Sequence, residues 1–210
     1  MAGLFFSLDG IDGTGKSTQS DLFCQWLATH GHEIVRCRDP GTTELGETLR
    51  QIVLHGTASI EPRSEVLIYM TSRAQLVAEI IQPALCAGKT VVCDRFLLAS
   101  VAYQGYGLGL DPDEIWALGQ FATAETYPDL SFLLDIEVDL AVSRLSAETD
   151  RLEQRTRDYH QRVREGFLAE AARHSDKIVV VDASAEVESV QSEIRRQAAD
   201  YLDGRCKPDA

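Results

Sequence analysis

The chain has 210 residues, a length that fits one domain able to bury a core without disulfide or metal staples. Its 33 acidic and 20 basic residues give a net charge of −13, which argues against a long nucleic-acid polymer as a partner. The apolar runs are shorter than the ~20 residues that cross a bilayer, and residues 1–4 do not resemble a secretory signal, so we expect no membrane partner and a cytoplasmic location.

Short apolar runs alternate with longer segments of helical spacing. Strands are predicted, in chain order, over residues 4–8, 33–37, 90–93, 130–136 and 177–181. Helices are predicted over 16–29, 44–54, 62–87, 111–126 and 185–203, and over an arginine-rich stretch, 144–173, that is interrupted near 146–150. Continuous apolar strands are typical of a parallel sheet covered on both faces. We therefore expect one α/β domain, residues 1–210, with a doubly wound, five-stranded parallel sheet and helices on both faces.

The first predicted strand leads into a glycine-rich turn, and this turn opens the first predicted helix. Residues 10–17, GIDGTGKS, match the phosphate-loop pattern GxxxxGK[ST] in full. In this pattern backbone N–H groups and a helix N-terminus surround an anion, the lysine reaches the β- and γ-phosphates, and the hydroxyl binds Mg²⁺. The sequence thus predicts a P-loop NTPase fold and a nucleoside triphosphate site formed by Gly10, Ile11, Asp12, Gly13, Thr14, Gly15, Lys16, Ser17 and Thr18.

The third predicted strand ends in a carboxylate, Asp94. A strand of this kind beside a phosphate loop is the Walker B arrangement, in which the carboxylate lies near the metal ion, directly or through water. In a parallel sheet the carboxyl ends of the strands share one edge, where ligands bind. We therefore expect Ser17 and Asp94 to hold Mg²⁺ together with the phosphates of ATP.

The nucleotide class and the reaction depend on the rest of the chain. The guanine motif Asn-Lys-x-Asp is absent, and motor or AAA ATPases are normally larger, so a small kinase fits best. Further segments are RDPG at 38–41, LIYMTSRAQ at 67–75, DRF at 94–96, SVAYQG at 100–105, PDL at 128–130 with LD at 134–135, and DRLE at 150–153. With these segments in this order, nearly the whole chain resembles the thymidylate kinases, which transfer the γ-phosphate of ATP to dTMP.

The resemblance implies how the base and sugar are bound. Tyr69 and Arg73 lie one helical turn apart, where the ring would stack on thymine and the guanidinium would donate to a pyrimidine carbonyl. Ser100 and Gln104 have the same spacing, and the Gln104 amide offers both a donor and an acceptor to the base edge. Tyr103 would lie against the deoxyribose and disfavour a 2′-hydroxyl.

The resemblance also implies which residues lie at the reacting phosphates. Asp12 matches a carboxylate near the 3′-hydroxyl and phosphate of the acceptor, and Arg95 would bridge the acceptor phosphate and the transferred group. Arg50 is a further candidate ligand of the acceptor phosphate, and Asp39 would orient these arginines. Outside the lid, the expected catalytic groups are Lys16, Asp12 and Arg95, whereas Arg50 and Asp39 are expected to bind the acceptor.

Two positions depart from the family pattern before the lid. Thr42 stands where a second glycine often follows the proline, so we expect Thr42 to adopt the backbone geometry of that glycine. Leu108 stands where an arginine is common.

The lid, expected at about residues 144–156, departs further. It has no arginine over 145–149, and the phosphate loop carries none either. Arg151 and Arg155 are therefore the expected replacements that neutralise the γ-phosphate in transfer. We expect the next arginines, Arg157, Arg162 and Arg164, to lie on a solvated helix face.

The function expected from the resemblance is phosphoryl transfer from ATP to dTMP, giving dTDP and ADP. A homodimer formed through helices beside the nucleotide site is also implied. Two alternatives remain at this point. One is a kinase for another nucleotide, a deoxynucleoside or shikimate; the other is a catalytically silent module that binds nucleotide as a switch or scaffold.

Overall fold

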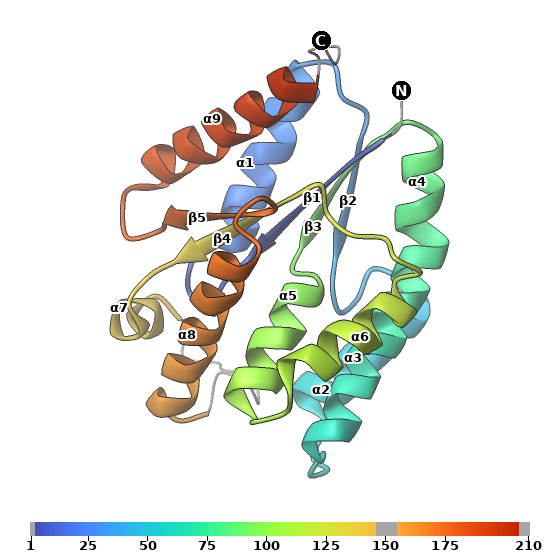
Figure 1. Ribbon diagram of the computed structural model, residues 1–210, viewed down its shortest axis with the longest axis vertical. Helices are drawn as coiled ribbons and strands as arrows, with labels where there is room; N and C mark the ends of the chain where they lie inside the picture. Colours follow the sequence, from blue (N-terminus) through green and yellow to red (C-terminus); the bar gives the residue numbers. More distant parts are fainter. Residues whose placement is uncertain (1–2, 146–154, 206–210) are drawn as a thin grey trace.

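The computed structural model describes residues 3–145 and 155–205. At its centre lies a five-stranded sheet with strand order β2-β3-β1-β4-β5, and every pair of neighbours is parallel (Figure 1). The expected parallel sheet is therefore confirmed. The strands are β1 (Leu4–Asp9), β2 (Ile34–Arg38), β3 (Thr90–Asp94), β4 (Leu130–Asp135) and β5 (Ile178–Asp182).

Helices cover both faces of the sheet. On one face α1 (Lys16–Thr29) packs beside α9 (Val187–Arg205), as Figure 1 shows. The other α-helices lie on the opposite face or beyond the carboxyl ends of the strands: α2 (Glu44–His55), α3 (Pro62–Leu76), α4 (Gln82–Cys86), α5 (Leu97–Ser100), α6 (Pro112–Ala122), α7 (Val138–Ser143) and α8 (Arg157–Arg173). No helix in the described part of the chain is long and apolar enough to cross a membrane.

Two helical segments have π-helical hydrogen bonding. Segment η1 (Val77–Ile81) joins α3 to α4, so the helix predicted over 62–87 is helical as far as Cys86 but not α-helical throughout. Segment η2 (Val101–Gly107) continues α5 and carries part of the predicted SVAYQG motif. π-Helical turns inside helices are frequent at functional sites, because the extra residue re-aims the side chains around it.

The helix predicted over 111–126 is shorter than expected. It ends at Ala122, because Ala124 and Glu125 have φ values of +46° and +58°. Backbone in this left-handed region cannot continue a right-handed helix. The short helix α7 was not predicted.

The core fixes the strand that leads into the phosphate loop. Successive side chains of β1 point to opposite faces of the sheet. Phe6 packs against Phe23 of α1 with ring centroids 5.3 Å apart, and against Phe132 of β4 at 6.2 Å. Phe5 packs on the other face against Phe96, at 5.0 Å. Each of these rings is at most 1% exposed, and burying one contributes roughly 1.5–3 kcal/mol.

Candidate active site

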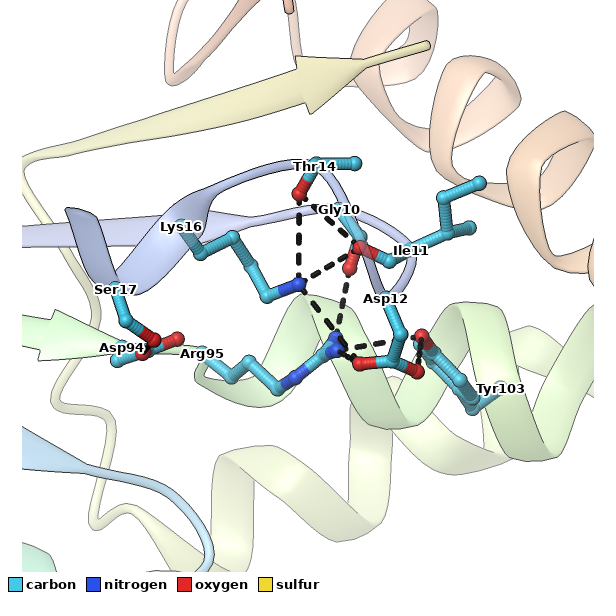
Figure 2. Close-up of polar contacts among 9 residues, drawn as sticks. All are labelled: Gly10, Ile11, Asp12, Thr14, Lys16, Ser17, Asp94, Arg95 and Tyr103. Carbon is cyan, nitrogen blue, oxygen red and sulfur yellow. Dashed lines mark hydrogen bonds and ion pairs between the residues drawn. The ribbon is translucent and has the colours of Figure 1, made fainter. Parts of the chain in front are cut away.

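The phosphate loop connects β1 to α1 and surrounds the amino group of Lys16 (Figure 2). Gly13 and Gly15 have φ values of +84° and +86°, which glycine adopts at little cost. A Cβ on Gly13 would lie 2.2 Å from the carbonyl oxygen of Ala141 in α7, so no side chain fits there. Successive residues in such a turn form a concave nest of N–H groups that binds an anion.

Lys16 is held inside this loop. Its Nζ donates a 2.7 Å hydrogen bond to the carbonyl of Ile11 and lies 3.9 Å from Asp12 Oδ1. Burial, together with the nearby charge of Arg95, lowers the pKa of Lys16 to about 8. A phosphate brought into the loop would favour the charged form, because an opposite charge within a few ångströms raises the pKa of an amine.

Ser17 and Asp94 lie together at the carboxyl end of β3. The Ser17 hydroxyl donates a 2.7 Å hydrogen bond to Asp94 Oδ2 (Figure 2). Among the described residues no group of three or more His, Cys, Asp or Glu side chains could hold a metal. Mg²⁺ usually takes one or two protein oxygens and fills its other positions with water and substrate phosphates. A hydroxyl and a carboxylate side by side fit that ion.

Asp12 links the phosphate loop to the segment after β3. Its carboxylate forms an ion pair with Arg95, and its Oδ2 accepts a 2.8 Å hydrogen bond from the Tyr103 hydroxyl (Figure 2). Arg95 also donates to the carbonyl of Gly10, at 2.7 Å, and its guanidinium lies 5.1 Å from the centre of the Tyr103 ring. Burial alone would raise the pKa of Asp12, but the charges of Arg95 and Lys16 lower it to about 2. Asp12 is therefore ionised at neutral pH.

Arg73 lies in the last turn of α3, and its side chain is 1% exposed. Its Nε donates a 2.5 Å hydrogen bond to Asp39 Oδ2, and its Nη2 donates to Ser100 Oγ at 2.9 Å and to the carbonyl of Phe96 at 3.2 Å. These bonds fix the plane of the guanidinium. Asp39 thus orients Arg73, whereas the sequence analysis expected it to orient Arg50 and Arg95.

Gln104 and Tyr69 complete this second group. Gln104 lies in η2, is 1% exposed, and donates from Nε2 to Glu65 Oε1 at 3.0 Å. Tyr69 packs in a small buried cluster with Val53 and Leu54 of α2. The structure therefore places the Tyr69 ring partly in the core and partly at the hollow described next.

Most of the predicted residues line two adjoining hollows, whereas Gly10, Ile11, Thr14 and Arg155 line neither. Four of the predicted residues belong to both hollows: Asp12, Asp39, Arg50 and Arg95. The donor hollow is completed by Gly13, Gly15, Lys16, Ser17, Thr18, Arg38 and Asp94. The acceptor hollow is completed by Leu54, Tyr69, Arg73, Ala99, Ser100, Tyr103 and Gln104. Two arginines and two carboxylates thus stand where one hollow meets the other.

The turn after β2 positions Arg50. Arg50 donates a 3.0 Å hydrogen bond to the carbonyl of Pro40. Thr42 has a φ of +70°, so the prediction that it takes a glycine-like backbone geometry is confirmed. The strained residue is held by its neighbours: Thr42 Oγ1 accepts from the N–H of Arg38 at 2.8 Å, and the Thr42 N–H donates to Glu47 at 2.7 Å.

The lid is largely outside the described residues, and Arg151 lies there with residues 146–154. Arg155 is described. Its Nη2 lies 3.1 Å from Glu65 Oε2, and its guanidinium lies 4.7 Å from the centre of the Tyr159 ring. Arg155 therefore faces the acceptor side of the site in this structure.

The expectation that the following arginines lie on a solvated face is wrong for Arg164. Its side chain is 15% exposed and makes two hydrogen bonds, of 2.8 and 2.9 Å, to the carboxylate of Asp135 at the end of β4. Arg162 is exposed, as expected, and donates to the carbonyl of Gly107. Arg157 is exposed and pairs with the exposed Asp139, as expected. The sequence could not distinguish them, because their partners come from distant parts of the chain.

Two buried carboxylates were not predicted as site residues. Asp9 accepts a 3.2 Å hydrogen bond from the N–H of Phe96 and so supports the backbone beside Arg95. Glu65 binds Gln104 and Arg155. A sequence signal for Glu65 exists: it precedes Tyr69 by one helical turn and Arg73 by two, so all three lie on one face of α3.

Comparison with known proteins gives consistent matches. A family model described as thymidylate kinase matches residues 8–194. The thymidylate kinase of Leifsonia xyli subsp. xyli is 47% identical over 206 residues, which cover 97% of this chain and 96% of that protein. The thymidylate kinase of Clavibacter sepedonicus is 46% identical over 201 residues, covering 94% of this chain and 95% of that protein.

A solved structure agrees. The crystal structure of thymidylate kinase from Ehrlichia chaffeensis matches with a TM-score of 0.79 at 29% identity, covering 94% of this chain and all of the other. The expected P-loop NTPase fold is thereby confirmed.

Proposed function

Because the chain belongs to the thymidylate kinase family, we propose that it phosphorylates dTMP with ATP, giving dTDP and ADP, a step in dTTP synthesis. The observation that carries this function is the pair of adjoining hollows that share Asp12, Asp39, Arg50 and Arg95. One hollow has the phosphate loop, and the other has the groups that suit a pyrimidine nucleotide. Their common boundary is where a phosphoryl group would pass.

The donor side binds the triphosphate of ATP. The loop amides and the amino group of Lys16 surround the β- and γ-phosphates. Ser17 and Asp94 would hold Mg²⁺, whose bound charge neutralises the phosphates. Both residues line the donor hollow, and Ser17 is exposed.

The acceptor side binds dTMP. Tyr69 stacks on the thymine ring, Arg73 donates to a base carbonyl, and Gln104 meets the base edge. Ser100 holds the Arg73 guanidinium in place. Tyr103 lies against the sugar.

Transfer then needs charge neutralisation more than proton transfer. The oxygen that attacks belongs to the acceptor phosphate and is already ionised, so no strong general base is required. Arg95 stands between the two hollows, and its ion pair with Asp12 fixes its guanidinium. Arg50 adds a second cation on the acceptor side. Arg151 and Arg155 remain the proposed lid arginines, and we keep residues 1–210 as one kinase domain with its lid at about 144–156.

We also propose that the enzyme is a homodimer. Three large apolar side chains are exposed on neighbouring helices: Ile52 of α2 is 44% exposed, Leu67 of α3 is 52% exposed and Phe121 of α6 is 86% exposed. Contacts join α2 to α3 and α3 to α6, so α3 has a neighbour on each side that also exposes a large apolar side chain. Phe121→Glu would weaken the dimer, and sedimentation velocity at several concentrations would detect the larger fraction of monomer in this variant. A wild-type chain that sediments as a monomer at every concentration overturns this proposal.

The function itself is tested with a panel of acceptors. Purified protein with ATP and Mg²⁺ is offered dTMP, dUMP, dCMP and dAMP, and ADP release is measured. Fastest turnover with dTMP is expected. Preference for a different acceptor would identify another nucleotide kinase, and ATP binding without any product would identify a silent nucleotide-binding module. The cytoplasmic location stays a prediction from the sequence.

A further inference from the structure

Glu65 is a fully buried carboxylate beside the acceptor hollow, and the mechanism above gives it no role. It is 0% exposed and lies on α3, one turn before Tyr69. Its oxygens hold donors from two other parts of the chain. Oε1 accepts from Gln104 Nε2 at 3.0 Å, and Oε2 accepts from Arg155 Nη2 at 3.1 Å.

The contact with Glu65 fixes which way the Gln104 amide faces. An ionised carboxylate only accepts hydrogen bonds, whereas an amide has one accepting and one donating end. Gln104 must therefore turn its NH₂ group toward Glu65. A 180° flip would bring the amide oxygen against the carboxylate and leave two buried acceptors facing each other. Such a mismatch is costly, because Gln104 is 1% exposed and water cannot relieve it.

Arg155 is the charged partner of this carboxylate. A buried charge is stable only with a partner of opposite charge and good hydrogen bonds. The Arg155 guanidinium supplies charge on the side of Glu65 away from Gln104, and its position over the Tyr159 ring holds it there. Glu65 therefore stays an acceptor toward Gln104.

The orientation of the Gln104 amide matters for the base. Thymine and uracil carry a hydrogen-bond donor, N3–H, between two carbonyls. Cytosine carries an acceptor at N3 and an amino donor beside it. Because the NH₂ group of Gln104 is directed to Glu65, its amide oxygen is left to face the base as a hydrogen-bond acceptor. This oxygen can accept from N3–H of thymine or uracil, whereas in cytosine it would face N3, which is a second acceptor.

We propose that Glu65 is a specificity-determining positioning residue: by fixing the Gln104 amide, it selects pyrimidine nucleotides that carry N3–H over cytidine nucleotides. This inference rests on the proposed function, since it assumes that the pyrimidine lies in the acceptor hollow. Glu65 acts through Gln104 and does not touch the reacting atoms.

The test is the selectivity of Glu65→Gln. A glutamine at 65 can present either end of its amide, so Gln104 becomes free to flip. The ratio of kcat/KM for dCMP to that for dTMP should rise about 10- to 100-fold, the range for one mismatched buried hydrogen bond. The ratio of dUMP to dTMP should stay unchanged, because uracil has the same N3–H. Ratios measured on one preparation do not depend on the fraction of folded enzyme.

A matched control separates specificity from stability. Glu170 is also 0% exposed, and it accepts hydrogen bonds from Tyr106 and Trp116, away from the acceptor hollow. Glu170→Gln should leave both selectivity ratios at their wild-type values. In a Gln104→Leu background, Glu65→Gln should add no further change. If Glu65→Gln keeps the wild-type ratio of dCMP to dTMP, the inference is overturned.

A second measurement needs no change at Glu65. In ¹H–¹⁵N spectra of the wild-type protein with dTMP, the side-chain NH₂ signals of Gln104 can be assigned with Gln104→Leu. Slow exchange with solvent is expected, and exchange as fast as that of the exposed Gln120 contradicts the fixed amide. A wild-type enzyme that ignores dTMP would instead defeat the proposed function, so the two failures are distinct.

Discussion

The hydroxyl of Tyr103, in η2, donates a 2.8 Å hydrogen bond to the carboxylate of Asp12 in the phosphate loop. Burial raises the pKa of Tyr103, so its hydroxyl stays protonated and keeps donating at neutral pH. The contact ties the loop that binds ATP to the helix that lines the acceptor hollow. Groups held in this way keep two substrates in fixed relative positions, which is the main contribution a protein can make to phosphoryl transfer.

Tyr103→Phe should weaken this connection. Asp12 would lose one buried hydrogen bond and keep Arg95, and a lost bond to a charged group costs about 1.5–3 kcal/mol. We expect kcat/KM for dTMP to fall about 10-fold or more, measured by ADP release. Tyr106→Phe is the control, because the Tyr106 hydroxyl binds Glu170 away from the hollows. If Tyr103→Phe and the wild type have equal kcat/KM for dTMP, the hydrogen bond between Tyr103 and Asp12 does not contribute to catalysis.

Lys16→Ala should abolish most turnover. The amino group is the cation inside the phosphate loop, and loss of a comparable electrostatic stabiliser costs about 10²-fold or more in kcat. Lys89→Ala is the control, since Lys89 pairs with the exposed Glu33 outside both hollows. An unchanged rate in Lys16→Ala would refute the assignment of the loop.

The same lysine predicts a pH dependence. The profile of kcat/KM reports the free enzyme, and that of kcat reports the enzyme with substrate bound. Since the pKa of Lys16 is lowered to about 8, kcat/KM for ATP should fall as the pH rises above about 8 and the amine loses its proton. Bound phosphates favour the charged amine, so the corresponding fall in kcat should lie at higher pH. A profile of kcat/KM for ATP that shows no fall near pH 8 would contradict this prediction.

The ion pair between Arg73 and Asp39 should matter for stability as well as binding. The two side chains are 1% and 0% exposed. Asp39→Ala leaves the guanidinium buried without its charge partner, and breaking a buried pair costs about 3–5 kcal/mol. Urea denaturation should show a loss of that size. Arg157→Ala, which breaks a pair whose side chains are 60% and 73% exposed, should change stability far less. Equal effects would mean that Arg73 is held mainly by its other partners.

The site was predictable from sequence where its signals are local. The phosphate loop occupies consecutive residues, and the pairs Tyr69 with Arg73 and Ser100 with Gln104 follow helical spacing, although the resemblance to a family was needed to assign these pairs to the site. The glycine-like geometry of Thr42 was also predictable, because it follows from one position in one turn.

What the sequence left open depends on contacts between distant segments. Helical spacing places Glu65 on the face of α3 that carries Tyr69 and Arg73, but its contacts with Gln104 and Arg155 follow only from the fold. Arg164 looks solvated until β4 brings Asp135 beside it. Helix α6 ends before Ala124 and Glu125 because both residues have positive φ values. Neither alanine nor glutamate favours positive φ, so this end was not evident from the sequence.

The most direct test of the proposed activity is a coupled assay of the purified protein with ATP, Mg²⁺ and dTMP, in which ADP and dTDP are both quantified. We predict that ADP forms only when dTMP is present, in equal amounts with dTDP, and that Lys16→Ala suppresses both. ADP release that does not depend on dTMP, or no product at all from protein that binds ATP, would contradict it.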